Sequence, residues 1–248
     1  MPTPMQFEGH TALVTGGSLG IGKAICQALL ERGATVIDVD IREPDYRHPR
    51  LEWRRVDLAE PEEVRGLAAD VRREGRVGIL VNNAGVVRNT RLPDVCDEEF
   101  DLMVNLHLRT AICLTQACVA GMQERRFGRI VNLASRAIVG LAGRTVYGAT
   151  KAALVAMTRT WALEFGPDGI TVNAISPGPV ATPMLRKDIP EDSEAEQRLA
   201  QALPCRRLGN ADDVARAAVF FAAPESDWIT GQNLFVCGGA SIGASVPL

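Results

Sequence analysis

A tyrosine and a lysine stand four residues apart in the segment Tyr147-Gly-Ala-Thr-Lys151. If this segment is helical, the spacing places the phenol and the ammonium group on one face. A free tyrosine titrates at about 10, too high for acid–base chemistry at neutral pH, but a neighbouring ammonium group favours the phenolate and lowers its pKa. Ser135, at the end of a predicted strand, is placed to hold a substrate oxygen beside the phenol. Together the three residues predict a proton-transfer site, although a helical Tyr–Lys pair alone usually has no function.

A glycine-rich segment, Thr15-Gly-Gly-Ser-Leu-Gly-Ile-Gly22, joins a short apolar strand at residues 11–14 to a helix at 20–32. Gly16 permits a tight turn, Gly20 lets the backbone approach a pyrophosphate, and Gly22 allows the helix to pack closely on a sheet. The unpaired N–H groups and positive dipole of the helix N-terminus favour phosphate. The segment therefore predicts a dinucleotide site formed by Gly16, Ser18, Leu19, Gly20, Ile21 and Gly22.

Two acids lie on the same face of the next predicted strand, residues 35–39: Asp38 within the strand and Asp40 directly after its end. Asp40 is nearer the carboxyl end, where a carboxylate binds the adenosine ribose and repels a 2′-phosphate. This position favours NAD over NADP as cofactor. Two alternatives stay open: Asp40 is only a turn-forming acid, or Arg42 favours the phosphate of NADP.

Composition narrows the class of protein. The chain has 248 residues, 46% hydrophobic and 23% charged, enough apolar surface for a large core. A net charge of −3 gives no support for nucleic-acid binding. No run of about 18 apolar residues predicts a membrane span, and residues 1–7 do not resemble a secretory signal, so we expect a cytoplasmic protein. Six cysteines without a CxxC pair and three scattered histidines predict neither disulfides nor a metal site.

Strand-length apolar runs alternate with helical patterns along the whole chain. Further strands are expected at 54–56, 77–81, 129–134, 170–175 and 233–237, and further helices at 61–74, 97–124, 147–165 and 211–223. This order predicts an α/β fold: a doubly wound parallel sheet of the Rossmann type, three layers deep, in a single domain over residues 1–248. Residues 183–204 are poorly patterned, and they form either a solvated surface excursion or a lid over a site.

With these motifs in order, the chain resembles a short-chain dehydrogenase/reductase of about 250 residues. The resemblance covers nearly the whole length, and the motifs that carry it are Thr15–Gly22, Asp57-Leu58, Asn82-Asn83-Ala84-Gly85, Asn105, Ser135, Tyr147–Lys151 and Pro177-Gly178 with Thr182.

The resemblance implies a role for each motif. Tyr147 is the general acid/base, Ser135 orients the substrate oxygen, and Lys151 binds the nicotinamide ribose and depresses the tyrosine pKa. Asn105 holds a water that links Lys151 to solvent. The cofactor also contacts residues of three other motifs: Asp57 and Leu58 at the adenine, Asn83, Ala84 and Gly85 at the adenosine ribose, and Pro177, Gly178, Val180 and Thr182 at the nicotinamide. The resemblance further implies a homotetramer.

Two positions depart from the family pattern. The interval from Ser135 to Tyr147 is twelve residues where many relatives have thirteen, which affects the shape of the substrate pocket. Cys237 stands where relatives usually have aspartate, near an end of the chain that often lies at a subunit interface. We interpret it as a small packed thiol without a redox role.

Four arginines flank the predicted site: Arg88, Arg91, Arg136 and Arg144. They either recognise an anionic group on the substrate or form surface ion pairs, and the sequence favours ion pairs because exposed arginines are common.

The expected function is reversible hydride transfer between a nicotinamide cofactor and a secondary alcohol or its ketone. One alternative is an NADPH-dependent 3-oxoacyl-thioester reductase, which is supported only by Arg42 as a residue that could bind the 2′-phosphate. A second is a dinucleotide-binding sensor or scaffold without catalysis, which has no need of the set Asn105, Ser135, Tyr147 and Lys151.

Overall fold

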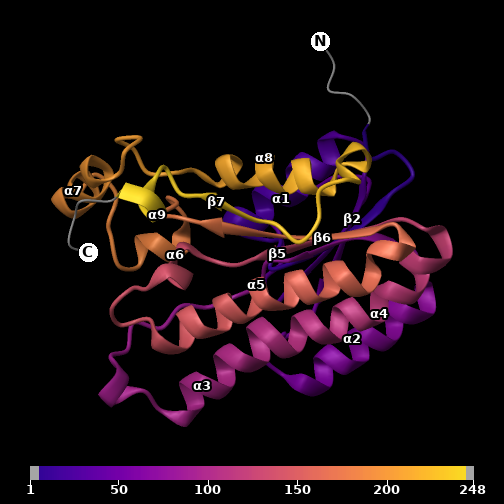
Figure 1. Cartoon of the computed structure of the whole chain (residues 1–248), viewed down its shortest axis with the longest axis horizontal. Coiled ribbons are helices and arrows are strands. Elements are labelled where there is room, and N and C mark those ends of the chain that lie inside the picture. The colour runs from indigo at the N-terminus through magenta and orange to yellow at the C-terminus, as the bar shows by residue number, and fades with distance from the viewer. Residues whose placement is uncertain (1–5, 244–248) are drawn as a thin grey trace.

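The computed structural model describes residues 6–243 and contains one seven-stranded parallel sheet (Figure 1). The strand order is β3-β2-β1-β4-β5-β6-β7. The strands are β1 (Thr11–Thr15), β2 (Thr35–Asp40), β3 (Leu51–Arg55), β4 (Val77–Asn82), β5 (Gly128–Leu133), β6 (Ile170–Pro177) and β7 (Asn233–Val236). The order reverses between β1 and β4, and in doubly wound sheets ligands bind outside the carboxyl ends of the strands at such a point. The predicted Rossmann-type sheet is confirmed.

Helices cover both faces of the sheet. One face carries α1 (Gly20–Glu31) and α8 (Ala211–Ala222), and the other carries α2 (Pro61–Glu74), α4 (Thr110–Arg125) and α5 (Thr145–Phe165) (Figure 1). Pro61 at the first turn of α2 and Gly75 in the left-handed conformation after it bound that helix as expected.

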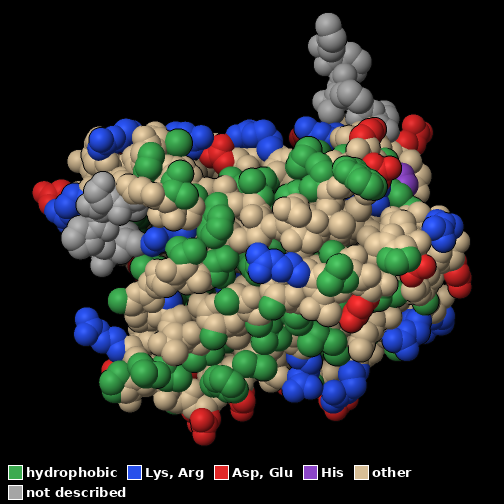
Figure 2. Space-filling model, in the orientation of Figure 1, with side chains coloured by type: hydrophobic (Ala, Val, Ile, Leu, Met, Phe, Trp, Pro, Cys, Tyr) green, Lys and Arg blue, Asp and Glu red, His purple; other side chains and the backbone are tan. Residues whose placement is uncertain are grey.

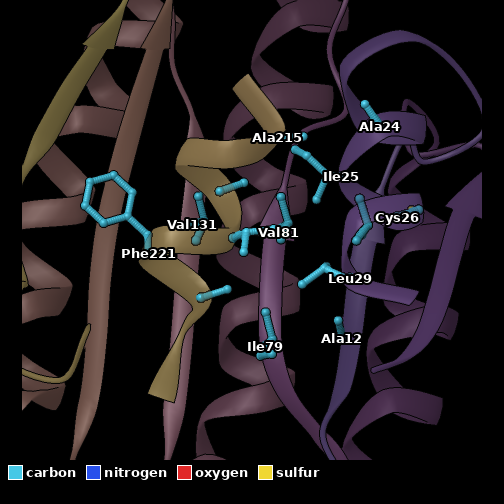
Figure 3. Close-up of a cluster of buried hydrophobic side chains, with 14 of the residues drawn as sticks. Ala12, Ala24, Ile25, Cys26, Leu29, Ile79, Val81, Val131, Ala215 and Phe221 are labelled. Atoms are coloured by element: carbon cyan, nitrogen blue, oxygen red, sulfur yellow. The ribbon is translucent and has the colours of Figure 1, made fainter. Parts of the chain in front are cut away.

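The core follows from the alternation of side chains along each strand. In β1, Ala12 and Val14 face α1 and α8, whereas Leu13 faces α2 and α4. Figure 3 shows the first of these clusters, with Ile25 and Leu29 of α1 packed between the strands and α8. Because both faces are buried, the central strands are apolar throughout, and they place their carboxyl ends along one edge.

Shorter elements complete the described chain. They are η1 (Leu92–Asp94), α3 (Asp97–Val104), η2 (Asn105–Arg109), η3 (Arg136–Val139), η4 (Gly166–Asp168), α6 (Pro183–Arg186), α7 (Glu194–Ala202), η5 (Pro224–Ser226) and α9 (Ala240–Gly243). Two of them, α6 and α7, lie in the poorly patterned stretch 183–204, which Figure 1 shows beside the carboxyl-end edge of the sheet.

Several boundaries differ by one or two residues from the sequence prediction, and three differences are informative. β3 covers Leu51–Arg55 instead of 54–56, because this edge strand carries Glu52 and Arg54 in an ion pair and so lacks an apolar pattern. α5 begins two residues earlier, at Thr145. The helix predicted over 97–124 is interrupted by η2, a π-turn that inserts a residue without breaking the apolar periodicity.

One continuous helical stretch, Asp97–Arg125, is long and apolar enough by length and composition to cross a membrane. Its residues Leu114, Cys118 and Met122 pack into the core against the sheet. We therefore assign it as a core helix of a soluble protein.

Candidate active site

The predicted site residues gather at the carboxyl-end edge of the sheet. They lie in the segments that follow β1, β2, β3, β4, β5 and β6, on the π-turn η2, and on the first turns of α5. Residues from separate parts of the sequence thus lie along one edge of the sheet, near the switch between β1 and β4.

Tyr147 and Lys151 lie on one face of α5, and Ser135 faces them from the end of β5. Lys151 Nζ is 5.9 Å from the centre of the Tyr147 ring, and the Ser135 side chain is near enough to the phenol to lower its pKa. Ser135 also caps η3, where its Oγ accepts a hydrogen bond of 3.1 Å from the backbone N–H of Ala137. That bond fixes the hydroxyl beside the phenol.

The expected lowering of the Tyr147 pKa by Lys151 is wrong for the structure without cofactor. Burial raises the pKa of Tyr147, and the opposing influences are the hydrogen bond with Ser135 and the charge of Arg144. Lys151 is itself buried, which lowers its pKa to about 7, and its Nζ donates to the carbonyl of Leu133 at 2.7 Å. Desolvation thus weakens the ammonium form that the prediction relied on.

His107 lies in the site and was missed by the sequence analysis. Its Nε2 accepts from the backbone N–H of Val86 at 3.1 Å, and its Nδ1 lies 2.8 Å from Thr150 Oγ1. The ring meets the Tyr147 ring edge-on at 5.8 Å. Burial, and then the nearby charge of Lys151, lower its pKa to about 2, so the ring is neutral and donates from Nδ1. The one signal was its place two residues after Asn105.

Asn105 opens the π-turn η2. Its side-chain oxygen accepts a hydrogen bond of 2.8 Å from Arg109 Nε, and its backbone carbonyl accepts one of 3.1 Å from Thr110 Oγ1. The side-chain oxygen therefore already has a partner on its own helix. The role of holding a water next to Lys151 remains a prediction.

The glycine segment after β1 is built for a phosphate. Gly16 and Gly20 have positive φ values of 68° and 56°. A Cβ on Gly22 would lie 2.0 Å from the carbonyl oxygen of Gly16, so only glycine fits there. Leu19, the N-cap of α1, supplies no side-chain cap, which leaves the first-turn N–H groups of Gly20, Ile21 and Gly22 for another acceptor. These features fit a dinucleotide pyrophosphate.

The two acids of β2 have different environments. Asp38 is fully buried, one of its oxygens accepts from Ser18 Oγ at 2.7 Å, and burial raises its pKa to about 6. Asp40 is half-buried at the strand end, where it accepts from the backbone N–H groups of Ser18 at 3.2 Å and Arg42 at 2.9 Å. Asp40 is therefore the acid beside the phosphate segment, as the sequence predicts.

The Asn82–Gly85 segment is tied to the glycine segment by buried hydrogen bonds. The Asn83 amide donates to the carbonyl oxygens of Thr15 at 2.8 Å and Gly16 at 3.1 Å, and Thr15 Oγ1 accepts from the N–H groups of Asn83 and Ala84. The Asn83 side chain thus joins the two segments. A Cβ on Gly85 would lie 3.0 Å from His107 Nε2 and 3.4 Å from Lys151 Nζ.

The remaining cofactor candidates lie around the same edge. Thr182 follows β6, packs beside Gly20, and caps α6 with its hydroxyl. Val180 is buried and bridges to Gly209. After β3, Asp57 accepts from the N–H of Ala59 at 2.9 Å, and the carbonyl of Leu58 accepts from Thr110. Pro177 ends β6, and Gly178 packs against the backbone of Cys237.

Two departures from the family pattern have a structural account. The loop between Ser135 and Tyr147 contains η3 and two glycines with positive φ, Gly140 and Gly143, and it still brings the serine to the phenol. Cys237 is buried with Leu203 and Ala240, and its sulfur is 3.2 Å from Ser241 Oγ. The interpretation of Cys237 as a packed thiol is confirmed.

The four arginines near the site differ in their exposure. Arg88 and Arg91 are exposed and Arg136 is half-buried on η3, whereas the Arg144 guanidinium lies 6.0 Å from the centre of the Tyr147 ring. No cluster of metal-ligating side chains occurs within residues 6–243.

Comparison with known proteins identifies the family of the chain. A family model described as Enoyl-(Acyl carrier protein) reductase matches residues 16–241. The chain is 38% identical to (2S)-[(R)-hydroxy(phenyl)methyl]succinyl-CoA dehydrogenase subunit BbsD of Thauera aromatica, over 96% of this chain and 99% of that protein. It is 37% identical to 3-oxoacyl-[acyl-carrier-protein] reductase FabG of Vibrio harveyi, over 95% of this chain and 98% of the relative.

Its fold also matches a solved structure named a short chain dehydrogenase/reductase family protein. The TM-score is 0.85 at 35% identity, with 96% of this chain and 100% of the other covered. Matches of this extent, together with the ordered motifs and the strand order, establish that the chain belongs to the short-chain dehydrogenase/reductase family of NAD(P)-linked oxidoreductases.

Proposed function

We propose that the protein transfers hydride reversibly between a secondary alcohol, or its ketone, and a nicotinamide cofactor. The observation that carries the proposal is the half-buried Tyr147 phenol on α5, which lies beside Ser135 and on the same helix face as Lys151. A sensor or scaffold has no use for such a proton-transfer group.

When bound, the nicotinamide accepts or supplies the hydride. The chain itself holds the substrate oxygen between Ser135 and Tyr147 and moves its proton. In oxidation the Tyr147 phenolate takes the hydroxyl proton, and in reduction the phenol returns it to the developing alkoxide. Lys151 and the uncapped first turn of α1 are placed to hold the ribose and the pyrophosphate.

The direct test replaces the phenol. We expect Tyr147→Phe to lower kcat by at least about 100-fold, because general acid–base catalysis contributes on the order of 10²–10⁴. Binding of NADH, followed by its fluorescence, should change little, since the ring and Lys151 remain. Turnover close to wild type in this variant would rule out the proposed role of Tyr147.

For the cofactor we propose NAD(H), supported by Asp40 beside the glycine segment. Its carboxylate repels a 2′-phosphate, so kcat/KM should be higher with NAD⁺ than with NADP⁺. Asp40→Ser should lower the ratio of kcat/KM with NAD⁺ to kcat/KM with NADP⁺ at least tenfold. A wild-type preference for NADP⁺ contradicts this use of Asp40 and favours the reading that rests on Arg42.

A second candidate is reduction of 3-oxoacyl thioesters. The FabG relative is named for that substrate and BbsD for an acyl-CoA, so both names describe acyl thioesters. Rates with 3-oxobutyryl-CoA and with simple ketones of similar size separate the two candidates.

We further propose a cytoplasmic homotetramer; the six cysteines are free thiols, as a reducing compartment maintains.

A further inference from the structure

The guanidinium of Arg144 lies in the site without a close acceptor. Within the described residues its side chain donates no hydrogen bond, and Nη1 is buried without a partner. Its one ionic contact is Asp188 Oδ2, 4.0 Å from Nη2. Burial lowers the pKa of Arg144, and the charges of Tyr147 and then Asp188 only partly oppose this. Because a buried donor without an acceptor is destabilising, the arrangement points to an acceptor that the chain does not supply.

The backbone around Arg144 is fixed even though its head group is not. Residues Thr90 and Arg144 form a parallel β-bridge that joins the loop after Gly85 to the start of α5. Asp188, which follows α6, is held by a hydrogen bond of 2.7 Å from Asn89 Nδ2. Three segments therefore meet above Tyr147, and Asp188 can remain on Asn89 when Arg144 takes another partner.

We propose that Arg144 binds a carboxylate of the substrate, so that the enzyme acts on hydroxy acids or oxo acids whose carboxylate lies a few bonds from the reacting carbon. The planar guanidinium matches a carboxylate with two parallel hydrogen bonds. Its place over the Tyr147 ring, 6.0 Å from the centroid, puts the carboxylate and the reacting oxygen on one small molecule. Asp188 is then the carboxylate that the substrate replaces. The inference rests on the proposed function, because Tyr147 marks the reacting oxygen.

The first experiment compares matched ketones that differ only in charge. Acetoacetate and acetoacetamide, and 4-oxopentanoate and its amide, are reduced with NADH by wild type, Arg144→Gln, Arg144→Lys and Arg73→Gln. Arg73 is an exposed arginine of α2, so its variant controls for net charge. Arg144→Gln should lower kcat/KM for the acids by about 10- to 100-fold, the usual effect of losing a hydrogen bond to a charged group. For the amides, kcat/KM should change less than about threefold. Arg144→Lys should lower kcat/KM for the acids by less than Arg144→Gln does.

A purely electrostatic role of Arg144 on the phenol predicts another result. Loss of that charge would slow acids and amides equally and shift the pH dependence of kcat for both, and this outcome overturns the proposal. The proposal is also overturned if wild type reduces the amides with the same kcat/KM as the acids.

The second experiment measures binding without turnover. Malonate, succinate and glutarate are titrated into the enzyme–NADH complex, and the fluorescence of bound NADH is followed. We expect at least one of them to bind wild type, Tyr147→Phe and Arg73→Gln alike, and to bind Arg144→Gln at least tenfold more weakly. Asp188→Asn should bind it more tightly, because a competing carboxylate is gone. Equal binding to wild type and Arg144→Gln, or none to wild type, overturns the proposal, whereas full turnover by Tyr147→Phe overturns only the proposed function.

Discussion

At the scale of single residues, the site depends on which polar groups are buried and what they contact. His107 links two segments that lie at the site. Its neutral ring links the N–H of Val86, after the Asn82–Gly85 segment, to Thr150 on α5. Thr150 Oγ1 in turn contacts the carbonyl of Tyr147 at 3.0 Å. One imidazole thus sets the distance between a cofactor segment and the helix that carries the phenol.

Asp38 gives a prediction at the same scale. Its carboxyl is fully buried and its pKa is about 6, above the ordinary value of 3.8. Between these two values the folded state binds more protons than the unfolded state, so stability falls as pH rises. The shift corresponds to about 3 kcal/mol of unfolding free energy lost above pH 6.

We therefore expect Asp38→Asn to be more stable than wild type at pH 8 and to differ little at pH 4, close to the ordinary pKa of 3.8. The amide can donate to Ser18 Oγ, whose own proton then goes to the carbonyl of Arg42, so the contact between residues 18 and 38 is kept without a charge. Urea unfolding at the two pH values measures the difference. Equal stability at pH 8 would mean that Asp38 is not a desolvated acid.

At the scale of elements, the contact of α1 with the glycine segment leaves no room for a side chain. A Cβ on Gly22 would meet the carbonyl of Gly16 at 2.0 Å and Asn83 Nδ2 at 2.6 Å. Gly22→Ala should push α1 off the sheet edge, lower stability by about 1–3 kcal/mol, and raise the Kd for NADH at least tenfold.

The control is Gly66→Ala in the exposed middle of α2, where an added Cβ meets nothing within 4 Å. That variant should be more stable by about 0.5–1 kcal/mol and bind NADH normally. Thermal unfolding and fluorescence titration cover both variants. Normal NADH binding by Gly22→Ala would show that α1 can be displaced without harm to the cofactor site.

Elements also show how far the sequence could lead. The alternation of strands and helices, the glycine segment and the Tyr147–Lys151 pair were predictable because each depends on local spacing: strand, turn, helix, and one helical turn. The π-turn at Asn105 was not, because an inserted residue leaves the apolar pattern of the helix intact. The roles of His107 and Arg144 depend on contacts between separate segments, and no local pattern specifies them.

Energetics were harder still to predict from spacing. The sequence placed Lys151 correctly beside Tyr147, yet it could not show that both side chains are desolvated. Burial reverses the direction of the expected pKa shift on the phenol.

Lid closure by residues 183–204 stays a prediction. The structure adds that Asn89 Nδ2 donates a hydrogen bond of 2.7 Å to Asp188, which lies within that stretch.

At the scale of the whole molecule, the outer face of α4 and α5 carries exposed hydrophobic side chains. Figure 2 shows hydrophobic side chains over these helices, interspersed with charged and other polar ones. A groove between the helices is lined in part by Ile112, Val119, Trp161 and Phe165, and on α5 Leu163 is 82% exposed. Contiguous exposed apolar surface is typical of protein–protein contacts. It is therefore where we expect the proposed homotetramer to associate.

Ile112→Glu tests that expectation, because residue 112 is 38% exposed in the single chain and its carboxylate can reach water there. Packed against a second copy, the same carboxylate would be buried without a partner, which disfavours association by several kcal/mol. Sedimentation velocity should find wild type as a tetramer and the variant as a smaller species, with unchanged circular dichroism. A wild type that sediments as a monomer contradicts the tetramer, and a variant that remains tetrameric places the interface elsewhere. If the smaller species keeps its turnover, each chain forms its active site alone.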